Sequence, residues 1–508
     1  MNLWQGVEPS QLIALSIIVP FVGSLLVVAT GKTPNLREAV TLTTAVILFS
    51  IVLAITDYSM QGPTLQGSAL SLDVIEIFPG LGLNFDVEPL GVLFALVASF
   101  LWIITSIYAI GYMRGHQEKN QTRFFCCFAL AISSVMAICF SGNLLTLFVF
   151  YEVLTLSTYP LVTHAGTDAA KQGGRTYLGI LLSTSIAFLL FAVLGTYVVT
   201  GTLDFRPGGI FDDSHSKTVL AVLLVLFCYG IGKAAIMPFH RWLPAAMVAP
   251  TPVSALLHAV AVVKAGVFSI LKVVIYIFGI DGLTDLVTTD IMLYIATATV
   301  LLSSCIAMTK DNLKARLAYS TVSQLSYIVV GALLASSVAA AGAALHIATH
   351  AVGKITLFFC AGAIMVASHK KNISDMVGLG RQMPLTMTAF TIGAISIIGL
   401  PPMVGTWSKW YLTIGALEAD KLIVVAALMI SSLLNIAYLL PIPIKAFFNT
   451  QSEGAAAWSW SETKEAPLPM LIALGVTSFG CLALFFYPQP LIDLINLIPG
   501  VSTSMGER

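Results

Sequence analysis

Long apolar stretches recur along the whole chain and constrain its fold more than any other feature. A helix needs about 20 apolar residues to cross the roughly 30 Å hydrocarbon core of a bilayer. Only 10% of the 508 residues are charged, whereas soluble domains carry about 25%. The sequence therefore predicts an all-α polytopic membrane protein with about 14 transmembrane helices, near residues 10–30, 37–57, 89–113, 122–140, 142–165, 175–199, 218–238, 251–280, 288–308, 318–338, 340–367, 384–416, 421–448 and 468–490.

Two further segments give local expectations. The segment 58–88 is longer and more polar than the other connections, and its stretch LDVIEIFPGLGLNFDVEPLG predicts an extended surface hairpin. The first ten residues, MNLWQGVEPS, contain no basic n-region and no small-residue cleavage site. We therefore expect the first apolar stretch to be a helix of the mature protein rather than a signal peptide.

The positions of lysine and arginine indicate a topology. With the N-terminus outside, 16 basic residues fall in inside loops and 4 in outside segments. Cytoplasmic loops of membrane proteins carry such an excess. We expect both termini on the extracytoplasmic side of a bacterial or archaeal cytoplasmic membrane. The inside residues are Lys32, Arg37, Arg114, Lys119, Arg123, Lys171, Arg175, Arg241, Lys310, Lys314, Arg316, Lys370, Lys371, Arg381, Lys445 and Lys464, and the outside residues are Arg206, Lys217, Lys421 and Arg508.

The sequence lacks the features that are typical of several classes of function. The formal net charge is zero, which gives no electrostatic footprint for nucleic acid. No nucleotide-binding loop and no haem or iron–sulfur ligand set is visible, so we expect no cofactor. The seven cysteines all fall in apolar segments without metal-ligand spacing, so we expect them to be small buried hydrophobic residues.

Five lysines remain inside the predicted helices: Lys233, Lys264, Lys272, Lys354 and Lys409. A lysine at the centre of a membrane helix costs roughly 2.5–3.5 kcal/mol on insertion scales. We expect Lys272 to extend toward the interface, as long side chains near helix ends do. The single mid-helix carboxylate, Glu152, cannot neutralise the other four. Several lysines must then be neutral, hydrated or paired with another subunit, and burial favours the neutral form of lysine.

Histidines add to this set of buried bases. His346, His350 and Lys354 stand at i, i+4 and i+8, so they share one face of a helix. This spacing predicts a path for protons, whereas a metal site lacks a nearby carboxylate. His258 and Lys264 are six residues apart and face different directions on a regular helix. They join one path only if the helix is distorted or the path turns there.

Two predicted helices are interrupted beside a lysine. The stretch GIGKAAIMP places Lys233 just before Pro238, and GLPPMVGTWSKW places Lys409 after two prolines. Interrupted helices at corresponding positions indicate inverted repeats. We predict N-terminal helices 1–3 with the hairpin over residues 1–121, five-helix repeats over 122–280 and 281–450, and a C-terminal helix and tail over 451–508.

Several longer stretches resemble a known family. PFHRWLPAAMVAPTPVSALLHAVAVVKAGVF closely resembles the signature of the proton-translocating antiporter-like subunits. These include the large membrane subunits of respiratory complex I and the multisubunit Mrp-type sodium/proton antiporters. GNLLTLFVFYEVLTLSTYPLVTH, HIATHAVGKITLFFCAG and GLPPMVGTWSKWYL match further blocks, and the resemblance covers roughly residues 85–450. Within the family, YEVLTLSTYPLVTH and SKW are most similar to the D subunits of the Mrp type.

The resemblance implies roles for residues of the first predicted repeat. Glu152 resembles the glutamate on the family's fifth helix. Lys233 resembles its partner lysine on the broken seventh helix. Lys264 resembles the central lysine of the proton path, with His258 nearby.

The resemblance extends to the second predicted repeat and to partners. His346, His350 and Lys354 resemble the bridge on the family's eleventh helix. Lys409 resembles the lysine on the twelfth helix that hands protons on. In the family, the glutamate of one subunit lies near the terminal lysine of its neighbour, so other membrane subunits are implied as partners.

Three functions remain open from the sequence. The first is a secondary transporter subunit, not an enzyme, in an antiporter that exchanges sodium or another monovalent cation for protons. The second is a proton-pumping subunit of a redox complex, either complex I or a membrane-bound hydrogenase. The third is a scaffold that supplies proton coupling in inorganic-carbon uptake. Complex I members and Mrp D subunits share nearly all the residues named above, so these motifs do not separate them.

Overall fold

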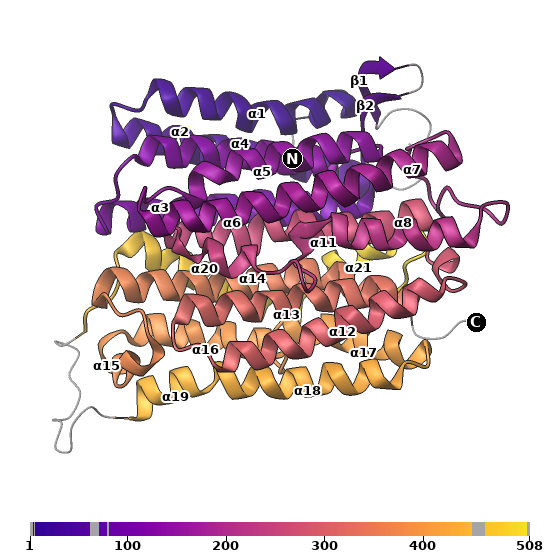
Figure 1. The fold of residues 1–508 in the computed structure, drawn as a ribbon. Coiled ribbons are helices and arrows are strands. Elements are labelled where there is room, and N and C mark those ends of the chain that lie inside the picture. The colour runs from indigo at the N-terminus through magenta and orange to yellow at the C-terminus, as the bar shows by residue number, and fades with distance from the viewer. Residues whose placement is uncertain (1–3, 5, 61–70, 79–80, 450–462, 505–508) are drawn as a thin grey trace.

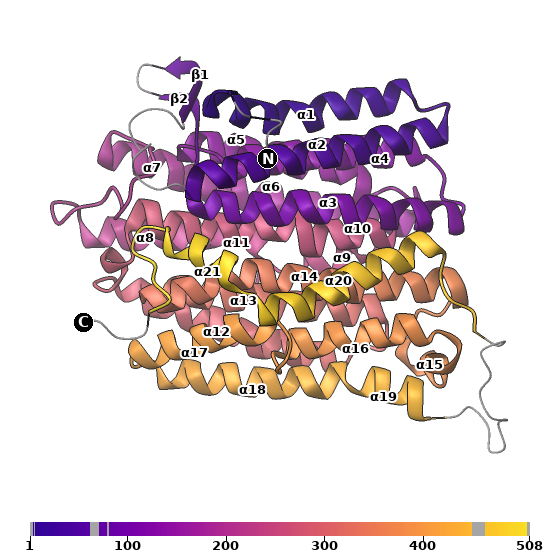
Figure 2. The same ribbon diagram turned by 180° about the vertical axis from the view of Figure 1, so that it is seen from behind.

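Long helices lying side by side form the whole body of the protein (Figures 1 and 2). The computed structural model describes residue 4 and residues 6–60, 71–78, 81–449 and 463–504. Apart from one two-stranded sheet, it is the predicted all-α polytopic membrane fold. The elements are α1 (Pro9–Ala29), α2 (Pro34–Met60), β1 (Ser71–Phe78), β2 (Leu81–Asp86), α3 (Pro89–Gly115), α4 (Gln121–Cys139), α5 (Leu144–Val162), α6 (Asp168–Thr184), α7 (Leu190–Thr200), α8 (Lys217–Gly230), α9 (Trp242–Ala245), α10 (Thr251–Ala255), α11 (Val262–Val273), α12 (Val287–Met308), α13 (Leu313–Leu333), α14 (Ser337–Ser368), α15 (Leu379–Gln382), α16 (Pro384–Ile398), α17 (Gly405–Glu418), α18 (Leu422–Leu439), α19 (Pro441–Phe448), α20 (Leu468–Phe486) and α21 (Gln489–Asn496).

Every one of the fourteen predicted windows contains helix. Within the described residues, eleven helices are long and apolar enough to cross a membrane. The other three windows hold α8, α13 and the pair α16–α17. The helices α8 and α16 are short because their windows are interrupted, and α13 carries a buried polar stripe that includes Ser320, Ser323 and Gln324. The number of crossings therefore stays a prediction for these three windows.

Side-chain caps explain where several helices begin. The side chain of Asn143 accepts a hydrogen bond from the backbone N–H of Thr146 at the start of α5. Thr167, Asn312 and Ser336 cap α6, α13 and α14 in the same way. Such caps satisfy backbone donors that have no partner within the helix.

The predicted hairpin is confirmed where it is described. Strands β1 and β2 pair antiparallel, with Ser71 opposite Asp86. Residues 61–70 and 79–80 of the predicted segment lie outside the described residues. An isolated bridge joins Phe85 to Ser141, so the hairpin lies against the α4–α5 connection. A second bridge, between Asn143 and Asp204, joins that connection to the one between α7 and α8. We call this end of the bundle the hairpin end.

The opposite end carries the loops assigned to the inside, and we call it the basic end. There Arg37 donates hydrogen bonds to Thr122 Oγ1 (3.2 Å) and Gln121 Oε1 (2.8 Å), and Arg114 pairs with Glu38. Helix α1 begins at the hairpin end, and the described part of the chain also ends there, at residue 504 (Figure 1). The basic residues thus gather as predicted, and which end faces the cytoplasm stays a prediction.

Both predicted helix interruptions are confirmed. Helix α8 ends at Gly230 and is followed by the 3-10 turn η4 (Gly232–Ala234), after which Ala235 has a φ of 58°. Helix α16 ends at Ile398, and Gly399 has a φ of 89° before α17 begins. The assignment of these two segments to inverted repeats, with the boundaries given above, stays a prediction.

One expectation for the cysteines was wrong. Cys139, Cys228, Cys360 and Cys481 are buried, but Cys305 is exposed. Helix α12 also exposes Ile291, Leu302 and Met308, so Cys305 lies on an outward-facing apolar surface. An apolar environment in a membrane protein includes lipid, so an apolar segment does not imply burial in protein.

The second interruption predicts a sharp difference between two glycines. A Cβ added at Gly405 would overlap the carbonyl oxygen of Ser396, whereas one added at Gly475 in α20 would meet nothing within 4 Å. We expect Gly405→Ala to destabilise the protein by about 1–3 kcal/mol, as overpacking does. Gly475→Ala serves as the control and should leave the thermal unfolding midpoint unchanged. Equal midpoints for both variants would show that α16 and α17 do not approach as described.

Candidate proton path

Six of the eight predicted site residues lie on the helices α5, α11, α14 and α17, which follow one another across the bundle (Figure 1). Lys233 lies in η4, and His258 lies just before α11. We call this set of residues the line. Seven of the eight are no more than 9% exposed, although all seven are basic. Buried ionisable groups in membrane proteins face partners or water-filled paths rather than lipid. The seven are Lys233, His258, Lys264, His346, His350, Lys354 and Lys409.

Lys233 is held by the neighbouring helix α5 at the first interruption. Its Nζ donates to the carbonyl oxygen of Tyr151 (2.7 Å) and to Thr155 Oγ1 (2.6 Å). The ammonium also lies 3.1 Å from the centroid of the Tyr151 ring, a cation–π arrangement. The carbonyl of Gly232 at the interruption accepts from the backbone N–H of Ala235 (3.0 Å) and from Trp242 Nε1 (3.0 Å). Backbone groups at the break are therefore satisfied inside the protein, as membrane depth requires.

Glu152 lies beside this site but does not form an ion pair with Lys233. Both carboxylate oxygens are covered and have no hydrogen-bond partner among the described residues. Lys233 binds Tyr151 and Thr155 instead. Glu152 neighbours Val153 and Leu156, which are exposed on the outer surface of α5. The structure thus places the carboxylate near the lateral face of the bundle, and the Glu152–Lys233 pair stays a prediction.

Lys264 and His350 form the central contact of the line. Lys264 Nζ on α11 lies 2.8 Å from His350 Nδ1 on α14. One hydrogen bond between two nitrogen bases can hold its proton on either atom, because either nitrogen can act as donor and the other as acceptor. This geometry permits a proton to move between helices that belong to different predicted repeats.

The helix that carries His258 is distorted, which was one of the two conditions under which His258 and Lys264 join one path. Residues Leu256–Val260 form the π-helix η6, and Ala261 breaks the helix before α11. Such wide turns are frequent at functional sites. The His258 ring lies 4.7 Å from the ring of Phe358 on α14, and both its nitrogens lack partners among the described residues. The structure does not bring His258 into direct contact with Lys264.

His346 continues the line toward the second interruption. The rings of His346 and His350 stack at 5.7 Å, which confirms that the two share one helix face. His346 Nδ1 lies 2.8 Å from Ser408 Oγ. Ser408 directly precedes Lys409 in the sequence, so this contact joins α14 to the turn of α17 that carries the terminal lysine.

Lys409 lies at the interruption between α16 and α17. Its Nζ donates to the carbonyl oxygen of Ile398 (2.9 Å), the residue at which α16 ends, and more weakly to Ser432 Oγ (3.3 Å). A cavity of about 380 Å³ reaches Lys409 between exposed apolar residues that include Trp410 and Leu433. The ammonium group is therefore approachable from the lateral face of the bundle.

Lys354 takes a different direction from the two histidines. Its Nζ donates to Ser320 Oγ on α13 (2.7 Å), and Tyr438 OH on α18 donates to the same oxygen (2.9 Å). The three predicted residues of α14 therefore reach three different helices, α17, α11 and α13. This branching follows from one helix packing against several neighbours.

The expectation for Lys272 was wrong. Its side chain is 0% exposed and lies 3.1 Å from Glu88 Oε2. It also donates to the carbonyl oxygen of Ser141 (2.6 Å). The residues before α3 and the α4–α5 connection cover this part of α11, so Lys272 finds its partners inside the protein and does not reach the interface.

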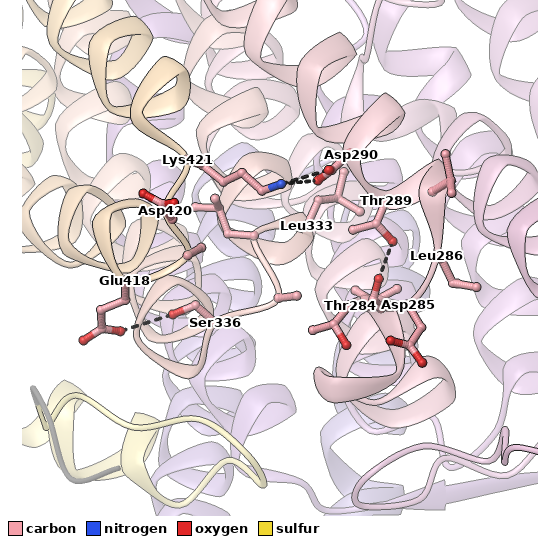
Figure 3. A pocket seen from close by; sticks show the side chains of 15 residues that line it. Thr284, Asp285, Leu286, Thr289, Asp290, Leu333, Ser336, Glu418, Asp420 and Lys421 are labelled. Carbon is pink, nitrogen blue, oxygen red and sulfur yellow. Dashed lines mark hydrogen bonds and ion pairs between the residues drawn. The ribbon is translucent and has the colours of Figure 1, made fainter.

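A separate cavity of about 530 Å³ lies at the hairpin end between α12, α13 and α17 (Figure 3). Lys421 pairs there with Asp290 at 2.7 Å, and Glu418 accepts a hydrogen bond from Ser336. None of the eight predicted site residues lines it. It is therefore distinct from the line of buried bases.

Sequence reasoning missed the neutral residues that hold the line together. Tyr151 directly precedes Glu152 and Ser408 directly precedes Lys409, so adjacency to a predicted site residue was a usable signal for these two. Thr155 follows Glu152 by three residues, which is about one helical turn. Ser320 and Tyr438 lie 34 and 84 residues from Lys354 in the sequence, and no local pattern indicates their contact.

Comparison with known proteins identifies related sequences. Residues 141–435 match the family model described as NADH:quinone oxidoreductase/Mrp antiporter, TM. The chain is 33% identical over 426 residues to NADH-quinone oxidoreductase subunit N of Desulforudis audaxviator, covering 82% of this chain and 84% of that protein. It is 32% identical over 417 residues to a protein of Rhizobium meliloti named as a probable K(+)/H(+) antiporter subunit, covering 78% of this chain and 39% of that protein. The chloroplast NAD(P)H-quinone oxidoreductase subunit 5 of Nuphar advena is 30% identical over 423 residues, and the match spans 55% of its length.

Two solved structures share the fold over nearly the full chain. One is the Mrp complex from a Dietzia species, with a TM-score of 0.84, 22% identity, and coverage of 97% of this chain and 98% of that one. The other is the membrane-bound sulfane sulfur reductase, an archaeal respiratory membrane complex, with a TM-score of 0.83, 22% identity and 96% coverage of both chains. At this identity the two structures establish the arrangement of helices alone.

The contact of Lys354 predicts a specific loss of stability. Ser320→Ala removes the oxygen that accepts from Lys354 Nζ and from Tyr438 OH. A hydrogen bond to a charged group contributes about 1.5–3 kcal/mol, so we expect a loss of that size in thermal unfolding of the purified assembly. Ser326→Ala is the control, because among the described residues Ser326 Oγ donates to Val322 O within its own helix and to no other helix. Equal unfolding midpoints would contradict the described contact.

Proposed function

The chain belongs to the NADH:quinone oxidoreductase/Mrp antiporter family, and from this membership we propose that it is the D-type subunit of a multisubunit monovalent cation/proton antiporter. In this proposal it is a secondary transporter subunit, not an enzyme. It moves protons inward along the buried bases while the assembly exports sodium. Its place is a bacterial or archaeal cytoplasmic membrane, with the hairpin end and both termini on the outer side.

One observation carries this proposal. The 2.8 Å contact between Lys264 and His350 joins two helices through two proton-binding nitrogens. Both residues are at most 1% exposed, where an isolated charge is costly. An uncharged structural contact would satisfy the packing at lower cost, so the pair of bases favours proton transfer over a purely structural role.

The geometry gives a sequence of proton positions. A proton on Lys264 moves to His350 Nδ1 through their shared hydrogen bond. The stacked ring of His346 and the hydroxyl of Ser408 then lead to Lys409. The Nε2 atoms of both histidines have no partner among the described residues, which leaves each ring able to bind or release a second proton.

Glu152 and Lys233 provide the switch in this proposal. When the carboxylate approaches Lys233, it stabilises the ammonium form, and when it departs, the ammonium holds its proton less tightly. The described arrangement supports the open state of the switch, because Lys233 binds Tyr151 O and Thr155 Oγ1 rather than Glu152. Opening the pair drives a proton toward Lys264.

A neighbouring subunit completes the path at Lys409. The cavity beside Lys409 opens between exposed apolar side chains on the lateral face of α17 and α18. Exposed apolar residues around a buried polar group are typical of a docking surface as well as of lipid contact. We infer that a partner membrane subunit presents a carboxylate to Lys409 there, as the resemblance implies.

A redox-driven complex is the second candidate. The relative in Desulforudis audaxviator is named a subunit of NADH-quinone oxidoreductase, and it is matched over most of its length. In that alternative the same residues carry protons while electrons move through other subunits. The antiporter interpretation is favoured by the resemblance of YEVLTLSTYPLVTH and SKW to Mrp D subunits and by the named antiporter relative.

The switch predicts the behaviour of two variants. We expect Lys233→Ala and Glu152→Ala each to abolish cation/proton exchange without preventing assembly, because each removes one charge of the switch. Exchange is measured as sodium-induced proton movement in vesicles from an antiporter-deficient strain. Lys217→Ala is the control, since Lys217 is 66% exposed and pairs with Asp285 at the surface. Wild-type exchange in either switch variant would refute this mechanism.

The composition of the native assembly separates the two candidates. We expect the complex purified in mild detergent to contain several membrane subunits without flavin or iron–sulfur proteins. Mass spectrometry of the intact complex measures this directly. Companion subunits with redox centres would replace the antiporter by the redox-driven alternative.

A further inference from the structure

Lys272, a buried lysine that the proposed path does not use, lies in register with Lys264, which the path does use. Lys264, Phe268 and Lys272 are spaced four residues apart along α11, so they form one stripe on one face of the helix. Lys272 lies two turns, about 12 Å, beyond Lys264 in the direction of the hairpin end. Tyr276 extends the same spacing into the following turn.

Lys272 is completely enclosed by protein. Its Nζ lies 3.1 Å from Glu88 Oε2 and 2.6 Å from the carbonyl oxygen of Ser141. The rings of Phe205 and Phe268 lie 4.4 Å and 5.6 Å away. A buried ion pair of this kind adds little net stability compared with well-packed apolar residues, so its presence calls for another explanation.

Glu88 is the side of the pair that approaches water. Its side chain is 13% exposed, while that of Lys272 is 0% exposed. Glu88 immediately precedes α3 and follows strand β2, so it lies at the hairpin end of the bundle. The pair therefore has a fully enclosed cation and a carboxylate that is mostly covered but partly exposed at the hairpin end.

Unpartnered polar atoms surround this pair. The hydroxyl of Tyr276 and the Oδ1 atom of Asn84 are buried without a hydrogen-bond partner among the described residues, and Lys272 is the sole contact of Glu88 Oε2. Native proteins commonly satisfy such atoms with ordered water. Asp86 adds a second carboxylate at the same place, close enough to interact with both Glu88 and Lys272.

We propose that protons enter the bundle at the hairpin end through Glu88, which exchanges them with water. We call this entry site the port, and Lys272 is the positioning residue that holds the Glu88 carboxylate in place. The port rests on the proposed proton path, which it extends from Lys264 along the α11 stripe. It is separate from Lys409, which lies on α17 at the second interruption. Phe268, which is fully buried and packs against Phe94 at 5.2 Å, closes the stripe in the described conformation.

The proton balance of the port is simple. Glu88 binds one proton from water at the hairpin end and becomes neutral, which leaves Lys272 without its counter-charge. The proton then passes inward through water to Lys264, and Glu88 returns to its carboxylate form against Lys272. Lys272 keeps its proton throughout. No bond other than O–H and N–H is made or broken.

Electrostatics at the port are consistent with this role. Burial raises the pKa of the Glu88 carboxyl, Lys272 opposes this rise, and the negative charge of Asp86 adds to it. The charged and titratable groups that face Glu88 are Lys272, Asp86 and Tyr276. Removing the cation leaves only burial and the charge of Asp86, which both raise the pKa of Glu88. Glu88 then stays protonated to higher pH and releases its proton less readily.

The test uses the assembled complex in vesicles. We expect Glu88→Gln to reduce exchange at least tenfold, Lys272→Arg to retain it, and Lys272→Met to shift the pH of half-maximal exchange upward by about one unit or more. Asp290→Asn is the matched control, because it also removes a carboxylate paired with lysine at the hairpin end. Assembly of each variant is measured on native gels.

A purely structural ion pair gives a different pattern. The double variant Glu88→Gln/Lys272→Met removes both charges of the pair together, so a structural role of the pair predicts that it restores exchange relative to either single variant. The port predicts that exchange stays lost. Restored exchange in the double variant, or an unshifted pH profile in an assembled Lys272→Met complex, would overturn the proposal.

Chemical labelling of the wild-type protein gives a second test, which does not depend on the folding of a variant. A water-soluble carbodiimide applied from the outer side should modify Glu88, detected by peptide mass spectrometry, and exchange should fall in proportion. Absence of modification at Glu88, or modification with full exchange, would overturn the port. If Lys233→Ala abolishes exchange while Glu88→Gln does not, the port fails and the proposed function stands. If both variants are fully active, both fail.

Discussion

Lysine side chains in the apolar interior of the bundle must find their partners inside the protein, and much of the structure follows from this requirement. An ammonium group in hydrocarbon cannot bind water, so each of these buried lysines binds an oxygen or nitrogen from another part of the chain. Lys233 reaches α5, Lys264 reaches α14, and Lys409 reaches the end of α16. The contacts that satisfy these charges are the same contacts that connect the helices into a proton path.

The helix interruptions expose hydrogen-bond acceptors, such as backbone carbonyl oxygens, that are already occupied in a regular helix. The carbonyl of Ile398 is freed where α16 ends, and Lys409 binds it. The interruption after α8 turns Lys233 toward Tyr151 and Thr155. A π-helix just before α11 changes the register of His258 relative to Lys264. Each of these three departures from regular helix thus lies beside a buried base.

The sequence was informative where the signal was local. Apolar length predicted the helices, proline and glycine predicted the interruptions, and the four-residue spacing of His346 and His350 predicted their shared face, which their stacked rings confirm. Prediction from the sequence failed where the contacting residues are distant in the chain. Lys272 was expected at the interface because no residue near it in the sequence indicates a buried partner. Its partner Glu88 lies about 180 residues earlier in the sequence. The hydroxyl partners of Lys354 were missed for the same reason, since tertiary packing and not periodicity brings them together.

The central claim is that the buried lysines exchange protons rather than serve as fixed charges. Nitrogen-15 NMR of the assembled complex, with labelled lysine and single Lys→Arg variants for assignment, measures the charge of each Nζ directly. The account predicts that at least one of Lys233, Lys264, Lys354 and Lys409 is a neutral amine near neutral pH and gains its proton as the pH is lowered. Four fully charged lysines over the whole range of pH in which exchange occurs would contradict it.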